Sequence, residues 1–222
     1  MNADTASLNQ KAEAAAAVYQ GLNLAVYDSL VLGLNTRFTW RCPNSRIIEL
    51  YKANLTTNHL DIGVGTGYFL RHAGFPPGKV RLGLLDLSPA SLALSVKRLA
   101  QYNPERYLAN VLEPINVSAP FDSVGLNYVL HCVPGTIETK RAVFRNIHAI
   151  LNPGGVLFGA TVLQTGVNHG WLARKMLPDL QRKGIFSNQQ DDLAGLERGL
   201  RECYSRCSVE VVGSVAIFRA WR

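Results

Sequence analysis

Apolar and polar positions along the chain follow two periods, one typical of strands and one typical of helices. Five apolar runs predict strands, at 57–62, 80–87, 106–110, 121–128 and 156–163. Helices are predicted between them at 66–72, 88–102 and 136–151, the second with Ser88 as its cap and Pro89 in its first turn. Strands that alternate with helices form a parallel sheet covered on both faces, so we predict an α/β fold.

The two ends of the chain depart from this alternation. Before the first strand, the pattern predicts helices at 7–19, 22–32 and 45–52, and we expect residues 1–54 to form a helical cover on a core of 55–222 within one domain. Near the other end, a helix is predicted at 191–206. The final runs 208–212 and 215–221 are separated only by Gly213-Ser214, and so short a link demands an antiparallel hairpin.

Length and composition indicate a globular protein. The chain has 222 residues, of which 47% are apolar and 18% charged, enough for one domain with a real core. No apolar run approaches the roughly 20 residues that a membrane span needs, and the first 20 residues lack the features of a signal peptide. The last two of the four cysteines lie four apart on a predicted helix, and we expect reduced thiols in a cytoplasmic protein, not a zinc site.

The net charge of +7 raises the possibility of a nucleic-acid partner or an acidic substrate. However, Lys and Arg are scattered along the chain in pairs such as Lys97-Arg98, with no basic stripe interleaved with aromatic residues. We therefore predict solvated helix faces, with neither nucleic acid nor membrane as a partner. The sequence does not define an oligomeric state.

The most informative segment is a glycine-rich turn directly after the first predicted strand. It carries Asp61, Gly63, Gly65 and Gly67 at alternate positions. Glycines permit unusual backbone angles and leave the backbone bare, and the free N–H groups of the next helix can bind a ligand. We predict that this turn holds an adenosine-bearing cofactor; the alternative is a tight turn with no ligand. The dinucleotide fingerprint requires a third glycine at position 68, where this chain has Tyr68.

This pattern resembles the first motif of the class I S-adenosylmethionine-dependent methyltransferases, in which the acid and the glycine turn contact the amino-acid end of the cofactor. The resemblance implies a Rossmann-like, doubly wound, seven-stranded sheet whose last strand inserts beside the fifth. It also implies S-adenosylmethionine as the cofactor. The chain is similar to small microbial members that methylate small molecules, such as secondary metabolites, by in-line displacement. The turn at 152–155 resembles a later structural motif of this family.

Further cofactor residues are predicted after the second and third strands. Asp86 lies nineteen residues after Gly67, where a carboxylate can accept from both hydroxyls of a ribose; a helix-capping role is the alternative. Family members usually carry Asp at the position of Asn110, which contacts the adenine amino group, and the Asn oxygen can make the same contact. A turn role for Asn110 without a ligand is equally open. We expect Leu87 and Val111 to complete this part of the site.

The end of the fourth strand carries the candidates for chemistry, because ligands bind at the carboxyl ends of parallel strands. We predict that Asn127 contacts the cofactor and Tyr128 the acceptor. The Asn-Tyr pair lacks the intervening prolines of the nucleic-acid amino-methyltransferase signature. His131 is the predicted general base, since its ordinary pKa lies near neutrality; a loop histidine with a structural bond is the alternative. No carboxylate cluster accompanies this strand, so no metal is predicted.

Aromatic and histidine residues in two variable segments are predicted to line the acceptor pocket. Tyr27 and Trp40 lie in the N-terminal cover, and His169 and Trp171 follow the fifth strand. Ordinary packing is the alternative for the aromatic residues.

Two other functions fit the same motifs. A protein of this fold can retain the cofactor without methylating, as a cyclisation catalyst or binding protein. A nicotinamide-dependent oxidoreductase would also place an acid at position 86, but the glycine spacing disfavours it.

Overall fold

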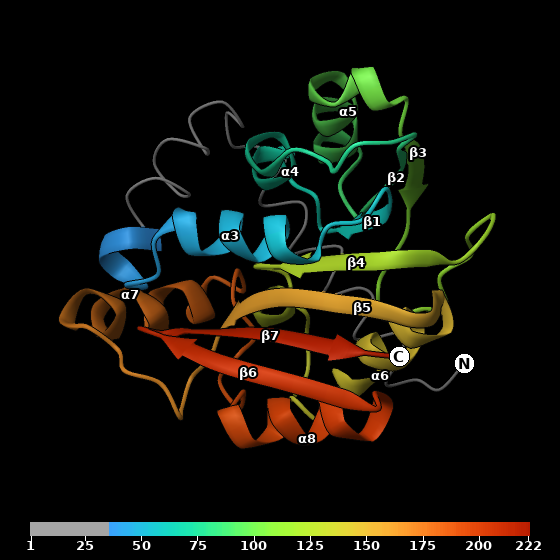
Figure 1. The fold of residues 1–222 in the computed structure, drawn as a ribbon. Coiled ribbons are helices and arrows are strands. Elements are labelled where there is room, and N and C mark those ends of the chain that lie inside the picture. The colour runs from blue at the N-terminus through green and yellow to red at the C-terminus, as the bar shows by residue number, and fades with distance from the viewer. Residues whose placement is uncertain (1–35) are drawn as a thin grey trace.

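A seven-stranded sheet runs through the computed structural model, which describes residues 36–222 (Figure 1). The strand order is β3-β2-β1-β4-β5-β7-β6. The first five strands are parallel, and β7 lies antiparallel between β5 and β6. This arrangement confirms the predicted sheet, hairpin and insertion of the last strand. The strands are β1 (Asn58–Ile62), β2 (Arg81–Asp86), β3 (Glu105–Leu108), β4 (Phe121–Asn127), β5 (Leu151–Val162), β6 (Arg206–Val212) and β7 (Val215–Trp221).

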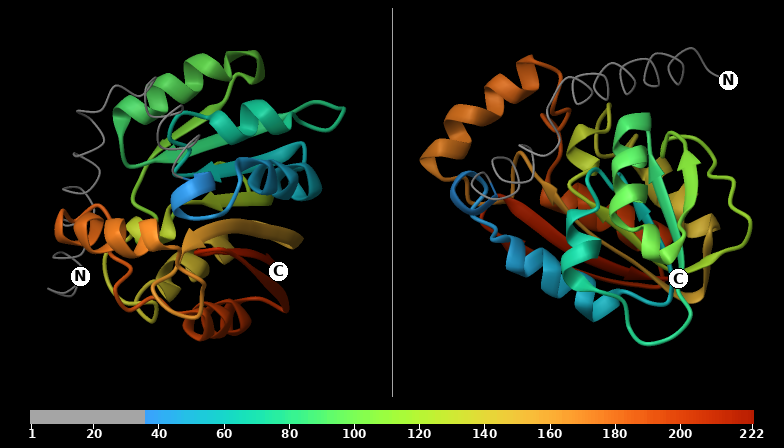
Figure 2. Two further views of the ribbon diagram at one scale, coloured as in Figure 1. Left: turned by 90° about the vertical axis from the view of Figure 1, so that its left-hand side faces the viewer. Right: turned by 90° about the horizontal axis from the view of Figure 1, so that it is seen from above.

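Helices cover both faces of the sheet, which gives three layers (Figure 2). The apolar sides of the helices form two hydrophobic cores with the sheet between them. One core includes Leu50 of α3 and Phe158 of β5, and the other includes Phe144 of α6 and Leu200 of α8. The helices are α3 (Asn44–Asn54), α4 (Tyr68–Ala73), α5 (Pro89–Arg98), α6 (Arg141–Ala149), α7 (Trp171–Arg182) and α8 (Leu193–Cys203), with short 3-10 helices η2 (Ala100–Tyr102) and η3 (Leu130–Cys132).

The strand order reverses between β1 and β4. From β1 the chain moves outward through β2 to β3, and it then returns to place β4 on the other side of β1. In open α/β sheets the loops at such a reversal diverge and leave a crevice in which ligands bind. The loops that follow β1 and β4 are therefore the expected walls of the site.

The start of β5 differs from the prediction. The predicted helix at 136–151 is shorter, because α6 covers only Arg141–Ala149. The segment 152–155, predicted as a turn before the strand, lies within β5 as a bulge, because strand partners jump from Phe121↔Leu151 to Ser123↔Val156. Hydrogen bonds from Gly154 N–H to the Arg222 carbonyl and from Arg222 N–H to the Gly155 carbonyl hold this bulge against the end of the chain.

One helix was not predicted, one further prediction is wrong, and two predicted helices lie outside the described residues. The helix α7 was not predicted; it carries Pro178 in its interior and buries only Ala173 and Leu177, so its apolar pattern is thin. Cys207 lies on β6 and not on a helix with Cys203. The helices predicted at 7–19 and 22–32 belong to the part that the structure does not describe, whereas α3 confirms the helix predicted at 45–52.

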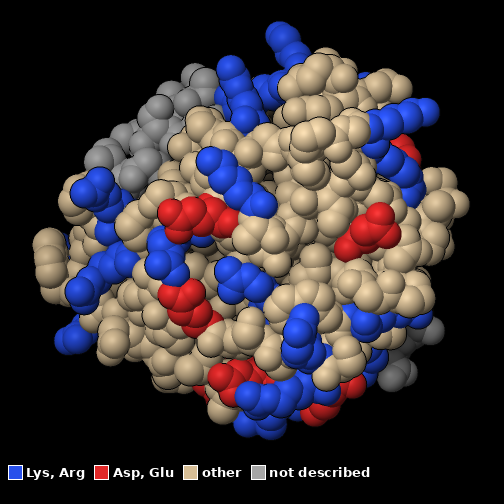
Figure 3. Space-filling view, in the orientation of Figure 1, with Lys and Arg blue, Asp and Glu red and all other residues tan. Residues whose placement is uncertain are grey.

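Three further properties of the described residues concern membrane-spanning helices, disulfides and the distribution of charge. Within 36–222, no helix combines the length and apolar character needed to cross a bilayer. The four cysteines, all in this range, form no disulfide. Lys and Arg side chains are spread over the face shown in Figure 3, with Asp and Glu among them and no continuous basic stripe.

Candidate active site

The glycine-rich segment forms a sharp turn between β1 and α4. Gly63, Gly65 and Gly67 adopt φ of 65°, 53° and 73°, the left-handed region that favours glycine. At Gly63 there is also no room for a side chain, since a Cβ atom would lie 2.1 Å from Cγ2 of Val129. The turn therefore brings bare backbone against the loop that follows β4, as a ligand-binding turn requires.

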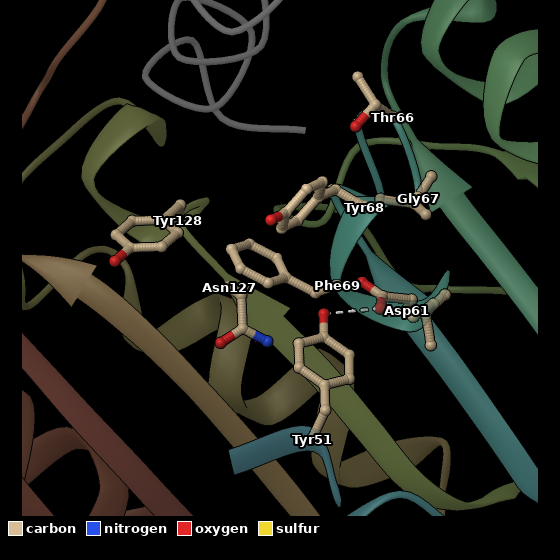
Figure 4. A pocket seen from close by; sticks show the side chains of 12 residues that line it. Tyr51, Asp61, Thr66, Gly67, Tyr68, Phe69, Asn127 and Tyr128 are labelled. Carbon is tan, nitrogen blue, oxygen red and sulfur yellow. Dashed lines mark hydrogen bonds between the residues drawn. The ribbon is translucent and has the colours of Figure 1, made fainter. Parts of the chain in front are cut away.

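A small pocket lies between this turn and the end of β4 (Figure 4). It encloses about 70 Å³, which suits one end of a nucleoside ligand and not the whole of it. The pocket unites predicted residues from two distant segments: Asp61, Gly63, Gly65 and Gly67 from the first, and Asn127 and Tyr128 from the second. Thr66, Tyr68 and Phe69 complete the wall on the side of the turn.

The carboxylate of Asp61 is held by a residue that the sequence did not suggest. The hydroxyl of Tyr51, on α3, donates a hydrogen bond of 2.7 Å to Oδ2 of Asp61, and both residues are buried (Figure 4). Burial, and next the negative charge of Asp61, raise the pKa of Tyr51 well above its ordinary value. The hydroxyl therefore keeps its proton and acts as a donor, which orients the carboxylate at the pocket wall.

A second buried side chain stands beside this pair. Nε2 of His59 lies 3.8 Å from Oδ2 of Asp61 and has no hydrogen-bond partner among the described residues. Its Nδ1 is 2.8 Å from the Ser123 hydroxyl, which fixes the ring. His59 is thus buried within the sheet next to Asp61.

Two side chains of the pocket, Asn127 and Tyr128, carry buried polar atoms without a hydrogen-bond partner among the described residues, and Asn127 has two of them. Asn127 is 7% exposed, and within 36–222 neither amide atom makes a hydrogen bond of ordinary geometry, although the amide lies near enough to the Tyr51 hydroxyl to oppose part of the rise in the pKa of Tyr51. Figure 4 places this amide among Tyr51, Phe69 and Tyr128. Because a buried amide without partners costs free energy, this arrangement points to a ligand that completes it.

Asp86 links the loop after β2 to the glycine turn. Its Oδ2 accepts a 3.0 Å hydrogen bond from the Gly65 N–H, and its Oδ1 accepts one of 2.9 Å from the Ser88 N–H. Burial raises the pKa of the carboxyl, and these backbone donors partly offset that effect. Each carboxylate oxygen has a second lone pair, so acceptor capacity for a ribose diol remains.

The residues after β3 lie at the same edge of the sheet but do not line the pocket. Oδ1 of Asn110 accepts a 3.0 Å hydrogen bond from the Leu112 N–H, which is the turn role that the sequence left open. Val111 is buried in the core, and Leu87 is half-buried beside Asp86. Contacts of these residues with an adenine ring stay a prediction.

Comparison with known proteins agrees with this geometry. A family model described as a methyltransferase domain matches residues 60–157. The chain is 40% identical over 199 residues to the demethylluteothin O-methyltransferase of Streptomyces thioluteus, covering 89% of this chain and 86% of that protein. The chain belongs to the class I S-adenosylmethionine-dependent methyltransferases.

Two further methyltransferases are similar to this chain, one in sequence and one in fold. The N-methyltransferase vrtF of Penicillium aethiopicum is 40% identical over 185 residues, which cover 82% of this methyltransferase and 77% of that protein. The structure of the N-methyltransferase NodS from Bradyrhizobium japonicum WM9 in complex with S-adenosyl-l-homocysteine superposes with a TM-score of 0.61 at 14% identity, over 97% of this chain and 96% of that chain.

The predicted base of this methyltransferase, His131, lies in a buried setting. It is 3% exposed; its Nδ1 accepts a 3.3 Å hydrogen bond from the Val162 N–H, and its ring centroid is 4.2 Å from that of Phe186. Burial, with a smaller effect from the charge of Lys140, lowers the pKa of His131 to about 3. The ordinary pKa near neutrality, from which the role of a base was predicted, does not apply in this buried setting, because a desolvated imidazole disfavours its charged form. The role of His131 as a base stays a prediction.

The predicted acceptor residues are dispersed. Tyr128 lies at the pocket and adopts a φ of 58°, which is uncommon for a residue other than glycine and typical of functional sites. Trp40 is buried and stacks on Phe186 with a centroid distance of 5.5 Å. Trp171 is 76% exposed at the start of α7, and His169 lines a different cavity. Tyr27 lies outside the described residues.

An ion pair that the sequence did not suggest lies beneath the loop of His131. Nζ of Lys140 is 2.6 Å from Oδ2 of Asp191, and both side chains are 0% exposed. Lys140 also donates to the Ser187 carbonyl at 2.9 Å, and the Ser187 N–H donates to the His131 carbonyl at 2.7 Å. The pair therefore joins the segment after α7 to the loop after β4.

Proposed function

We propose that this methyltransferase binds S-adenosylmethionine at the ends of β1 and β4 and transfers the methyl group to a hydroxyl oxygen of a small molecule. The observation that carries the proposal is the buried amide of Asn127, which has no partner within 36–222 and lies at the same pocket as Asp61 and the glycine turn. A cofactor with a charged amino-acid end would supply both the missing hydrogen bonds and a cation for the carboxylate.

Each cofactor residue has a distinct proposed role. Asp61, oriented by Tyr51, would bind the ammonium group of the amino-acid end, and Asn127 would bind beside it. Asp86 would accept from the ribose hydroxyls, with Leu87, Asn110 and Val111 near the adenine. When bound, the cofactor supplies an electrophilic methyl group on a sulfonium.

The acceptor is proposed to bind near Tyr128, at the mouth of this pocket. The protein's main contribution is then to hold the acceptor oxygen in position, because orientation can supply about 7 kcal/mol or more of a barrier. Burial lowers the pKa of His131 to about 3, so His131 is a poor base at neutral pH. A phenol ionises more readily than an alcohol and therefore depends least on a base, so we propose a phenolic acceptor. The name of the Streptomyces relative, an O-methyltransferase, supports oxygen as the acceptor atom, whereas the name of the Penicillium relative, an N-methyltransferase of equal identity, makes nitrogen the alternative.

Calorimetry tests the cofactor assignment. We expect S-adenosylhomocysteine to bind this protein, and NAD and NADP not to bind. Binding of NAD in place of S-adenosylhomocysteine would revive the oxidoreductase alternative and contradict the proposal.

A labelled-methyl assay tests the transfer. With methyl-labelled S-adenosylmethionine, we expect label in phenolic members of a panel of small acceptors, and not in matched aniline compounds. Transfer only to the anilines would overturn the oxygen assignment. A protein that binds S-adenosylhomocysteine but labels no compound of a metabolite extract would instead fit the alternative that retains the cofactor without methylating.

A further inference from the structure

A second and larger cavity lies near the turn between β6 and β7. It encloses about 530 Å³ and is lined by Arg41, Val167, Asn168, His169, Arg174 and Gly213. This volume falls within the range of small-molecule sites. The turn joins the β7 end that pairs with Val162, the last residue of β5, so the cavity lies at the same edge of the sheet as the cofactor pocket.

The cavity is positively charged. Its lining contains the guanidinium groups of Arg41 and Arg174 and no carboxylate among the described residues. Neither arginine forms a salt bridge to a residue in 36–222, whereas Arg46, Arg81 and Arg141 do. Two uncompensated guanidinium groups at one cavity attract an anion.

The backbone around Arg41 is built to hold its side chain at this place. Arg41 adopts a φ of 56°, a conformation that side-chain-bearing residues rarely take. Two glycines border its stem: an added Cβ would lie 2.6 Å from Cβ of Arg41 at Gly213, and 3.2 Å from Cδ of Arg41 at Gly170. Larger residues at either glycine would push the side chain out of its position.

Arg174 is held from the opposite wall. Its Nε donates a 3.2 Å hydrogen bond to the His169 carbonyl, and its terminal nitrogens have no hydrogen-bond partner in the described part of the chain. His169 is itself fixed, because Nε2 donates to the Gln164 carbonyl at 2.9 Å and Nδ1 lies 3.0 Å from the Ser214 hydroxyl. His169, predicted at the acceptor pocket, therefore lines this second cavity and not the cofactor pocket.

We propose that this cavity binds the carboxylate or phosphate group of a small molecule between Arg41 and Arg174. Planar guanidinium groups with free terminal nitrogens match the paired oxygens of both anions. Asn168, on the same lining, adds a side-chain amide that can donate to the ligand.

The position of the cavity, together with the proposed function, indicates which ligand it binds. β7 is two strands from β4, a separation of about 10 Å at ordinary strand spacing. A row of rings, Tyr128, His131, Phe186 and Trp40, spans this interval, with successive centroids 6.1, 4.2 and 5.5 Å apart. We assign the site to the acidic group of the acceptor, whose hydroxyl would lie near Tyr128.

Nuclear magnetic resonance titrations test the site without knowledge of the acceptor. Inorganic phosphate and benzoate are titrated separately into the full-length, isotope-labelled protein at constant ionic strength. We expect saturable shifts of the Gly170 and Gly213 amide signals with at least one anion. Arg41→Gln and Arg174→Gln should each raise the Kd by about tenfold. Arg182→Gln, which removes an equal charge from α7 outside the cavity, should leave the Kd unchanged.

The arms of the experiment separate the outcomes. Saturation by benzoate alone assigns a carboxylate, and saturation by phosphate alone assigns a phosphate. Absence of saturable shifts, or an equal loss of anion affinity in all three variants, would overturn the site, since the second result indicates general electrostatic attraction.

S-adenosylhomocysteine is titrated into the same samples. Anion binding without S-adenosylhomocysteine binding would leave the anion site standing and remove the cofactor proposal and the acceptor assignment.

Discussion

The hydroxyl of Tyr51 on α3 donates its hydrogen to the carboxylate of Asp61 on β1, over 2.7 Å and out of contact with water. This bond ties the helix that precedes the sheet to the residue expected to bind the charged end of the cofactor. Loss of this hydrogen bond should therefore weaken contacts with the amino-acid end of the ligand and leave contacts with the nucleoside unchanged.

Tyr51→Phe should raise the Kd for S-adenosylhomocysteine by about tenfold, because the carboxylate loses the donor that orients it. Calorimetry with 5′-methylthioadenosine, which lacks the amino-acid end, should give an unchanged Kd. Tyr102→Phe, a tyrosine of η2, serves as the matched control. Equal weakening of both ligands would show that the variant damages packing and has no specific effect on Asp61.

Asp86→Ala should weaken the binding of S-adenosylhomocysteine by at least about tenfold, since a carboxylate that accepts from two hydroxyls contributes about 1.5 kcal/mol or more. The same variant removes the acceptor for the Gly65 and Ser88 N–H groups, so its melting temperature is measured alongside. Asp122→Ala, at the opposite end of β4, controls for the loss of one charge. Wild-type affinity in Asp86→Ala would remove the ribose role.

His131 should make the folded protein sensitive to acid. Its folded pKa of about 3 lies below the unfolded value of about 6.5, so between these values the unfolded chain binds more protons. The free energy of unfolding should therefore be at its highest above pH 6.5 and fall by up to about 1.4 kcal/mol per pH unit below it. Denaturation curves of wild type and His131→Asn, whose amide oxygen can still accept from the Val162 N–H, should converge as the pH falls. A constant difference between them would contradict the low pKa.

The same histidine variant tests the predicted base. We expect His131→Asn to lower turnover while it leaves the affinity for S-adenosylhomocysteine nearly intact. Turnover is compared by methyl transfer to the best phenolic acceptor. Unchanged turnover would exclude His131 as the base and leave it the structural role that its bond to the Val162 N–H suggests.

The buried pair of Lys140 and Asp191 should show strong coupling. Lys140→Met alone should destabilise the fold by about 3–5 kcal/mol, because it leaves an unpaired buried carboxylate. The double variant Lys140→Met/Asp191→Leu should recover most of this loss, since apolar replacement of a whole buried pair is often neutral. Chemical denaturation of the two single variants and the double variant provides the measurement. If the losses of unfolding free energy in the two single variants add up to the loss in the double variant, the two charges do not interact.

Local patterns in the chain were sufficient to predict the sheet and the glycine turn. Period-two and helical runs specify strands and helices directly, and Gly63, Gly65 and Gly67 mark a turn that few other residues can form. Asn127 could be placed because the carboxyl ends of parallel strands meet at one edge.

Other features depend on contacts between residues far apart in the chain. In the sequence, Tyr51 fits the apolar side of a helix, and only the fold shows that its hydroxyl contacts Asp61. Lys140 lies 51 residues from its partner Asp191, so no local pattern indicates the ion pair. The helix α7 was missed because Pro178 interrupts its pattern. The low pKa of His131 comes from burial beneath Phe186, which no neighbouring residue in sequence signals.

The position of β7 in the sheet has a consequence for aggregation. β5 pairs with β4 on one side, and its other side is covered by residues 215–221 of β7. Without this pairing, the apolar residues of β5 would present an open edge that can pair with other chains. A truncation after Ser214, which removes β7, is therefore expected to yield aggregates and not a smaller folded enzyme.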